Sequence, residues 1–232
     1  MFAYPDCVIS SAVIYADWPE YHEIRFIRSR LQADDVIIDV GANIGHLLLL
    51  LADIVGPENL HGFEPTPVTF ARLRENWRLN SWGVGCLNQL AVGATASKMF
   101  IANTTRPVPT NSVQFGLVRS DDVAIEVRPL DAMIEFWRGR RIGLLKVDVE
   151  GFEKEVFAGA KSFLAGLRPR LIMFESLDKK IDTVVAESLA AACYRVFQLD
   201  GQGRPDFAGD SAQNLFAVPN ELEAELIAEK TM

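Results

Sequence analysis

Glycines and charged residues gather at three places in this 232-residue chain where their spacing suits ligand binding. The first is IIDVGANIGHLLLL at residues 37–50, in which an apolar run ends near Asp39 and a leucine-rich helical pattern follows Gly41 and Gly45. Such a strand-turn-helix brings the backbone and a helix N-terminus close to a ligand. The GxxxG spacing fits neither the GxGxxG dinucleotide fingerprint nor the P-loop. The turn therefore indicates a nucleotide cradle, with simple packing of helix on strand as the alternative.

The second place is Glu64, which ends the next apolar run in HGFEP, 25 residues after Asp39. A carboxylate at this strand end can accept hydrogen bonds from both ribose hydroxyls of an adenosine, each worth about 1.5–3 kcal/mol. Pro65 then makes the chain turn. We expect Glu64 to bind ribose; the alternative is a solvated carboxylate at a strand end.

The third place is LLKVDVEGFEKEVFAGA at residues 144–160. Lys146, Asp148 and Glu150 occupy alternate positions of a predicted strand that Gly151 ends, so we expect them on one face at the ligand-binding edge of the sheet. Charges in an apolar strand are costly unless they are paired or functional. The alternative to a catalytic group is a Lys–Asp ion pair that holds a loop.

Short apolar runs alternate with helical patterns along the chain. The runs suit strands buried on both faces of a parallel sheet, and they lie at residues 36–40, 60–63, 85–92, 143–147 and 171–174. The main helical patterns cover residues 44–55, 70–77, 184–193 and 221–229. This alternation predicts a doubly wound α/β fold.

Two regions depart from the alternation. Residues 95–129 hold three β-like pieces, at 99–102, 112–118 and 124–128, which predict a small β insert. The last two strands, 194–199 and 214–218, have no helix between them and should pair antiparallel. A mostly parallel sheet that finishes with an antiparallel strand is the expected architecture of one domain covering residues 1–232.

Composition excludes several classes of protein. Hydrophobic residues make up 49% of the chain, and 23 basic against 31 acidic residues give a net charge of −8. An acidic chain is a poor nucleic-acid binder, because such binding needs a basic face. The N-terminus has no signal-peptide pattern and the longest apolar run is too short to span a bilayer. Three cysteines without a CxxC pair predict buried or idle thiols in the cytoplasm.

Six segments together resemble the FkbM family of S-adenosylmethionine-dependent methyltransferases: DVGANIG at 39–45, FEP at 63–65, LAVG at 90–93, RPLD at 128–131, KVDVEGFEKEVFAGA at 146–160 and PRLIMFE at 169–175. The resemblance covers residues 23–218. It implies the class I methyltransferase fold, with a Rossmann-like sheet of seven strands whose last strand is antiparallel.

The resemblance also implies S-adenosylmethionine as cofactor and a set of residues around it. Its methionine part would lie in the cradle, its ribose at Glu64, and its adenine against a wall at Ala91 and Val92. His46, in the first turn of the helix, either contacts the cofactor carboxylate or is an ordinary helix-surface residue. The full cofactor set is Asp39, Gly41, Asn43, Gly45, His46, Glu64, Pro65, Ala91 and Val92.

Methyl transfer from a sulfonium mainly needs alignment of donor and acceptor, and a hydroxyl acceptor must also lose a proton. Asp148 and Glu150 are the first candidates for the base, with Lys146 holding their charge or orienting the acceptor. Glu175, which ends PRLIMFE, is the next candidate; its alternative role is to cap a loop. A hard-oxygen metal site formed by these carboxylates is a weaker hypothesis, and no metal is predicted.

The acceptor that we expect is a hydroxyl of a small molecule such as a sugar or a secondary metabolite. The alternative enzyme is an N-methyltransferase that acts on an amide or a peptide side chain. The alternative of another class is a partner protein that binds the cofactor but is catalytically silent. The missing GxGxxG motif disfavours a dehydrogenase. Specificity would come from residues 1–35, 95–129 and 200–213. Tyr15, Trp18, Tyr21 and His22 suggest a lid, with helix packing as the alternative. Self-association stays open.

Overall fold

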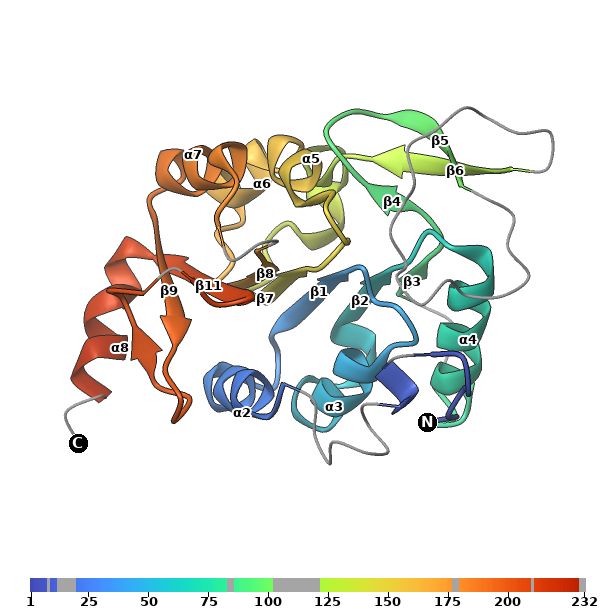
Figure 1. The fold of residues 1–232 in the computed structure, drawn as a ribbon, viewed down its shortest axis with the longest axis horizontal. Coiled ribbons are helices and arrows are strands. Elements are labelled where there is room, and N and C mark those ends of the chain that lie inside the picture. Colours follow the sequence, from blue (N-terminus) through green and yellow to red (C-terminus); the bar gives the residue numbers. More distant parts are fainter. Residues whose placement is uncertain are drawn as a thin grey trace.

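A central eight-stranded sheet runs through the molecule, with helices on both faces (Figure 1). The structure is a computed structural model that describes residues 1–7, 9–11, 20–82, 86–101, 122–176, 180–209 and 211–229. The strands are β1 (Val36–Val40), β2 (Leu60–Phe63), β3 (Leu87–Asn88), β7 (Ile142–Val147), β8 (Leu171–Glu175), β9 (Tyr194–Leu199), β10 (Pro205–Asp206) and β11 (Asn214–Pro219).

The strand order β10-β9-β11-β8-β7-β1-β2-β3 places β1 and β7 side by side in the middle of the sheet. β1 pairs in parallel with β2 and β7, and β7 in parallel with β8. β11 runs antiparallel to both of its neighbours, β8 and β9, which confirms the predicted pairing of the last strands. The prediction of seven strands misses β10, a two-residue edge strand that pairs with β9.

The apolar run at 85–92 does not form the single strand that its pattern predicts. It divides into β3, which pairs with β2, and β4 (Ala91–Val92), which belongs to a second sheet. The reason is that the backbone bonds go to different partners: Glu64 N donates to Asn88 O, whereas Gly93 N donates to Arg128 O.

The second sheet confirms the predicted β insert, in the order β4-β6-β5. β5 (Ser97–Ile101) and β6 (Val123–Arg128) pair antiparallel, and β4 adds a parallel pairing to β6 from outside the expected insert. The piece predicted at 112–118 lies outside the described residues.

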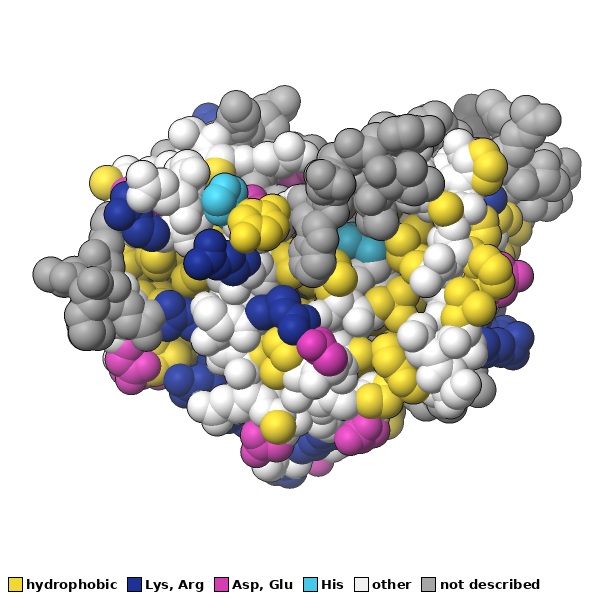
Figure 2. All heavy atoms as spheres, turned by 90° about the horizontal axis from the view of Figure 1, so that it is seen from below, with side chains coloured by type: hydrophobic (Ala, Val, Ile, Leu, Met, Phe, Trp, Pro, Cys, Tyr) yellow, Lys and Arg dark blue, Asp and Glu magenta, His cyan; other side chains and the backbone are white. Residues whose placement is uncertain are grey.

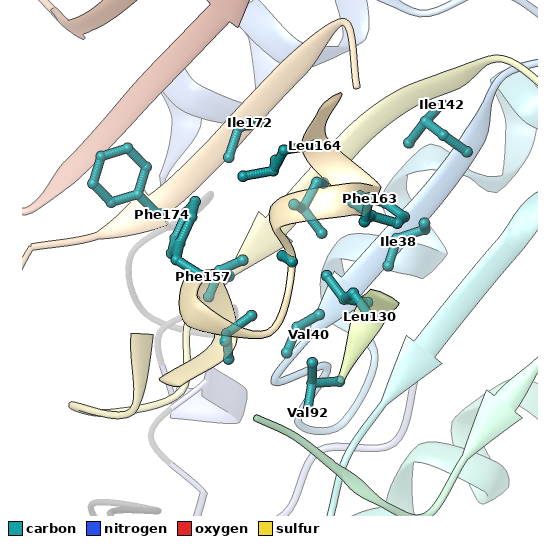
Figure 3. Packing of buried hydrophobic residues seen from close by; sticks show 14 of the residues in the cluster. Ile38, Val40, Val92, Leu130, Ile142, Phe157, Phe163, Leu164, Ile172 and Phe174 are labelled. Carbon is teal, nitrogen blue, oxygen red and sulfur yellow. The ribbon is translucent and has the colours of Figure 1, made fainter. Parts of the chain in front are cut away.

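One face of the central sheet is covered by α5 (Glu153–Ala158), α6 (Lys161–Gly166), α7 (Thr183–Ala191) and the 3-10 helix η2 (Leu130–Trp137). Phe157 of α5 and Phe163 of α6 are almost fully buried against strand residues such as Ile38 and Ile172 (Figure 3). Burial of side chains of this size stabilises each by about 1.5–3 kcal/mol. This apolar layer fixes the strand ends that carry the candidate site.

The other face is covered by α2 (Tyr21–Arg30), α3 (His46–Val55), α4 (Pro67–Arg78) and α8 (Glu223–Glu229), with short 3-10 turns η1 (Pro57–Asn59) and η4 (Asn220–Leu222). The predicted helices are thus confirmed with shifted ends. α3 begins at His46, because Gly45 has a φ of 87° and cannot be helical. α2 packs on the sheet through Ile24 and Ile27. Tyr15 and Trp18 lie outside the described residues.

The surface on the α2 and α3 side is mixed. Basic side chains there alternate with hydrophobic and acidic ones (Figure 2). All three cysteines are free thiols; Cys7 is buried, Cys86 is half-buried and Cys193 is exposed. Among the described residues, none of the helices has the length and apolar character needed to cross a membrane.

Candidate active site

The turn after β1 lies against the loop after β7. Gly41 and Gly45 both have left-handed φ values, 86° and 87°. A Cβ atom on Gly41 would lie 1.8 Å from the backbone oxygen of Asp148, and one on Gly45 would lie 2.5 Å from Leu73 Cδ1. Asn43, between them, also has a positive φ, 50°. The tight turn therefore serves to bring two of the predicted motifs into direct contact.

Gly41→Ala should lower the free energy of unfolding by about 3 kcal/mol, since it combines a strained φ with a clash against backbone. Gly139→Ala is a matched control: Gly139 has a φ of 76°, yet nothing lies within 4 Å of the added Cβ. That control should lose only about 1 kcal/mol. Urea unfolding measures both; equal losses would show that the contact with Asp148 does not matter.

Glu64 joins the turns that follow β1 and β2. Its side chain is only 4% exposed. Oε2 accepts a hydrogen bond from Asn43 N at 3.2 Å, and Oε1 accepts one from Thr66 N at 2.8 Å. Burial raises the pKa of Glu64 to about 7, although these two backbone donors oppose the shift. Glu64 is therefore a buried carboxyl with a raised pKa beside the glycine turn, and the solvated alternative is wrong.

Lys146 on β7 lies between two carboxylates. It pairs in register with Asp39 on β1, and its Nζ is 3.5 Å from Asp39 Oδ1 and 3.0 Å from Asp148 Oδ2. Lys146 and Asp39 are buried, whereas the Asp148 side chain is 34% exposed. Burial disfavours the ammonium, but Asp148, Asp39 and Glu20 outweigh it and raise the pKa of Lys146. Lys146 therefore stays charged.

Asp39 is the least satisfied member of this group. Burial raises the pKa of Asp39, and the nearby charge of Lys146 only partly offsets the effect. Its Oδ1 atom is buried without a hydrogen-bond partner. A buried carboxylate oxygen of this kind is costly unless a donor reaches it.

Glu20 is a site residue that the sequence motifs do not reveal. It precedes α2, far from the motifs in sequence, yet Oε2 lies 3.7 Å from His46 Nε2 and Oε1 accepts a hydrogen bond from Asn214 Nδ2 at 3.0 Å. Burial works against its charge, but His46, Lys146 and Asn214 lower the pKa of Glu20 to about 2. His46 itself is buried, and its Nδ1 has no hydrogen-bond partner. His46 is thus not an ordinary surface residue.

Glu20→Gln should lower the free energy of unfolding at pH 7 by about 2 kcal/mol, because the amide keeps the bond from Asn214 but loses the charge. A carboxyl with a lowered pKa stabilises the fold above its unfolded value of 4.5, and this contribution disappears as the pH falls toward 2. The difference from wild type should therefore shrink in urea unfolding at pH 3. Glu225→Gln, on the exposed side of α8, should show no such trend; an unchanged difference at both pH values would refute the ionic role.

The segment after β7 corrects one prediction. β7 ends at Val147, so Asp148 and Glu150 do not alternate on a strand that continues to Gly151. Glu150 is exposed with a φ of 53°. The cause is Glu153, a buried residue whose Oε1 accepts hydrogen bonds from Val149 N and Gly151 N and so curls the chain into a turn. Glu150 still lies within electrostatic reach of the group: burial, Asp148 and Glu153 raise the pKa of Glu150, and Lys146 opposes the shift.

Glu175 ends β8 at the same edge. Oε1 accepts a hydrogen bond from Gln213 Nε2 at 2.8 Å, while Oε2 is buried without a partner. Burial raises the pKa of Glu175, and the carboxylates of Asp148, Glu150 and Glu153 add to the shift. The carboxylates of Glu175, Asp148, Glu150 and Glu153 therefore influence one another at this edge of the sheet. In the described parts of the chain, however, no three His, Cys, Asp or Glu side chains are arranged to hold a metal ion.

Two of the remaining predicted residues lie in apolar clusters. Ala91 packs with Ile125 and Val127 of the small sheet, and Val92 lies in the core beneath α5 and α6. Pro65 is partly exposed after β2.

The chain resembles known proteins in both sequence and fold. The sequence signature of the methyltransferase FkbM domain matches residues 39–196, more than half of the chain. The chain belongs to the FkbM methyltransferase family. It has the class I methyltransferase fold, a Rossmann-like α/β fold with a mostly parallel sheet, antiparallel C-terminal strands and a small insert sheet.

Three relatives of this FkbM-family chain illustrate the similarity. Hexuronic acid methyltransferase AglP of Haloferax volcanii is 30% identical over 145 residues, which cover 62% of this chain and 58% of AglP. 31-O-demethyl-FK506 methyltransferase FkbM of Streptomyces tacrolimicus is 28% identical over 227 residues, covering 81% of this chain and 82% of that protein. The crystal structure of methyltransferase FkbM from Methylobacillus flagellatus KT matches with a TM-score of 0.55 and 17% identity.

That structural match covers 82% of this chain but 44% of the Methylobacillus chain. The chain thus spans just over half the length of AglP and less than half of this solved relative.

Proposed function

We propose that this FkbM-family methyltransferase uses S-adenosylmethionine and methylates a hydroxyl of a small-molecule acceptor, such as a sugar or a secondary metabolite. The observation that carries the proposal is the group formed by the buried Asp39 and Lys146 and the partly exposed Asp148 beside the Gly41 turn. Three carboxylates, including Glu20, surround one ammonium there. A surplus of carboxylates over ammonium groups suits a cationic ligand.

The residues present fit the cofactor. Asp39 Oδ1 is in an ion pair with Lys146 but accepts no hydrogen bond, so it can accept one from an ammonium group, and the Gly41 turn is a cradle that a Cβ would fill. We assign the methionine part to Asp39, Gly41, Asn43, Gly45 and His46, the ribose to Glu64 with Pro65 shaping the turn, and the adenine side to Ala91 and Val92. When bound, the cofactor supplies an activated methyl group.

The chain's own residues then act on the acceptor. Asp148 is one-third exposed while its Oδ2 bonds Lys146, so an acceptor hydroxyl can reach it. The Asp148 carboxylate can take the proton of the acceptor hydroxyl as a general base. Lys146 is a positioning residue in this scheme. Glu150 and Glu175 lie on the acceptor side of the edge.

The names of two relatives support oxygen as the methylated atom: one acts on hexuronic acid and one on 31-O-demethyl-FK506. Isothermal titration with S-adenosylmethionine tests the cofactor. Labelled cofactor offered with sugar, macrolide and peptide acceptors tests which atom of the acceptor is methylated. Absence of cofactor binding would defeat the proposal, and label found only in peptide amides would replace it with N-methylation.

A further inference from the structure

A cleft opens beside the proposed reaction edge, between the end of β8 and the start of α7. It has a volume of about 400 Å³. Its polar lining comes from the turn after β7, the end of β8 and the start of α7, and consists of Glu153, Lys154, Glu175, Ser176, Lys180, Asp182 and Thr183. A volume of this size suits a small molecule of about one sugar ring. The sequence motifs contain no signal for Ser176 or for the start of α7.

Two side-chain oxygens of residues that line the cleft, Ser176 Oγ and Glu175 Oε2, have no hydrogen-bond partner. Ser176 is 4% exposed, and its Oγ is buried without a hydrogen-bond partner although Ser176 N donates to Gln213 O at 2.7 Å. Glu175 Oε2 is likewise buried and unpartnered, while Gln213 fixes the other carboxylate oxygen. Buried polar groups of a native fold are normally satisfied by protein, water or ligand. These two adjacent residues are therefore set to meet a molecule in the cleft.

The chemistry of the two atoms selects the ligand. A carboxylate only accepts hydrogen bonds, and a serine hydroxyl both accepts and donates. A molecule that satisfies both must therefore bring at least one donor, and two neighbouring hydroxyls do so without adding charge. Ile181 and Val185 add an apolar wall, which suits the C–H face of a ring. Asp182 is an exposed carboxylate whose Oδ1 caps α7 by accepting a hydrogen bond from Val184 N.

We propose that this cleft is the acceptor site and that it binds a ring with neighbouring hydroxyls, one donating to Glu175 Oε2 and the other bonding Ser176 Oγ. The proposal rests on the methyl transfer proposed above. It makes Glu175 and Ser176 specificity-determining residues, distinct from the base at Asp148.

The test compares three ring probes by ligand-observed NMR titration on the full chain, with and without S-adenosylhomocysteine: cis-1,2-cyclohexanediol, cyclohexanol and cyclohexylamine. The diol should bind at least about 10-fold more tightly than cyclohexanol, the value of one additional hydrogen bond to a charged group. Ser176→Ala and Glu175→Gln should each remove most of that difference. Thr183→Trp, which fills the cleft from an exposed position, should abolish binding of the diol.

Matched controls come from the groove on the far side of α7. Ser188→Ala and Glu187→Gln change the same residue types there, among residues that line a separate groove, and should leave diol binding unchanged. Equal binding of diol and cyclohexanol, tightest binding of cyclohexylamine, no diol binding, or wild-type behaviour of the variants would each overturn the proposal.

Titration of the same samples with S-adenosylmethionine separates the two proposals. A chain that binds the cofactor but fails the diol test overturns the acceptor cleft alone. A chain that passes the diol test but binds no cofactor overturns the proposed methyl transfer instead.

Discussion

Replacement of Asp148 by Asn should lower kcat for methyl transfer to a hydroxyl by about 10²–10⁴-fold, the usual contribution of a general base. The amide oxygen can still accept the hydrogen bond from Lys146, so the loop should keep its place, but an amide cannot take a proton. The Kd for S-adenosylmethionine should change little. Single-turnover transfer of labelled methyl measures the rate, and calorimetry measures the affinity.

Asp53→Asn is the control for this variant, because Asp53 is an exposed aspartate whose partner, Arg28, lies far from the site. Its kcat should equal that of wild type. If Asp148→Asn is fully active while Glu150→Gln is not, the base is Glu150. Full activity of both variants would remove general-base catalysis by this loop.

Glu64→Ala should raise the Kd for S-adenosylmethionine by about 10²–10⁴-fold, because two charge-assisted hydrogen bonds to the ribose would be lost. Wild-type affinity should also weaken as the pH falls below the Glu64 pKa of about 7, since a protonated carboxyl is the poorer acceptor. Glu64→Gln cannot titrate and should lack this dependence. Calorimetry between pH 6 and 8 measures both; a pH-independent wild type would contradict the ribose role.

The same carboxyl gives a stability test that needs no cofactor. A pKa raised from 4.5 to about 7 means that the folded chain holds a proton that the unfolded chain has lost, so stability falls as the pH rises across this interval. The loss attributable to Glu64 is about 3 kcal/mol. Urea unfolding at pH 5 and pH 8 should show this loss in wild type relative to Glu64→Gln, and parallel curves would contradict it.

Local sequence patterns predicted the elements well. The β-branched runs, the apolar helix faces and the glycines of the β1 turn are signals carried by neighbouring residues, so strand and helix could be assigned before any packing was known. The ends of the strands were harder to predict from local sequence. The alternation of Lys146, Asp148 and Glu150 looks like a strand, but Glu153 bonds the backbone at Val149 and Gly151 and ends the extended conformation after Val147.

The sequence by itself determined the α/β fold, the family, and the motif residues that the proposal uses, because all of these depend on local periodicity and on short motifs. Only the tertiary structure decided that Glu20 meets both His46 and Asn214, and that Ser176 lines a cleft with α7. The reason is the strand order: β11 lies beside β8, and β7 beside β1, although neither pair is consecutive in the chain. The charges around Lys146 likewise come from three separate segments, and no single stretch of sequence contains them.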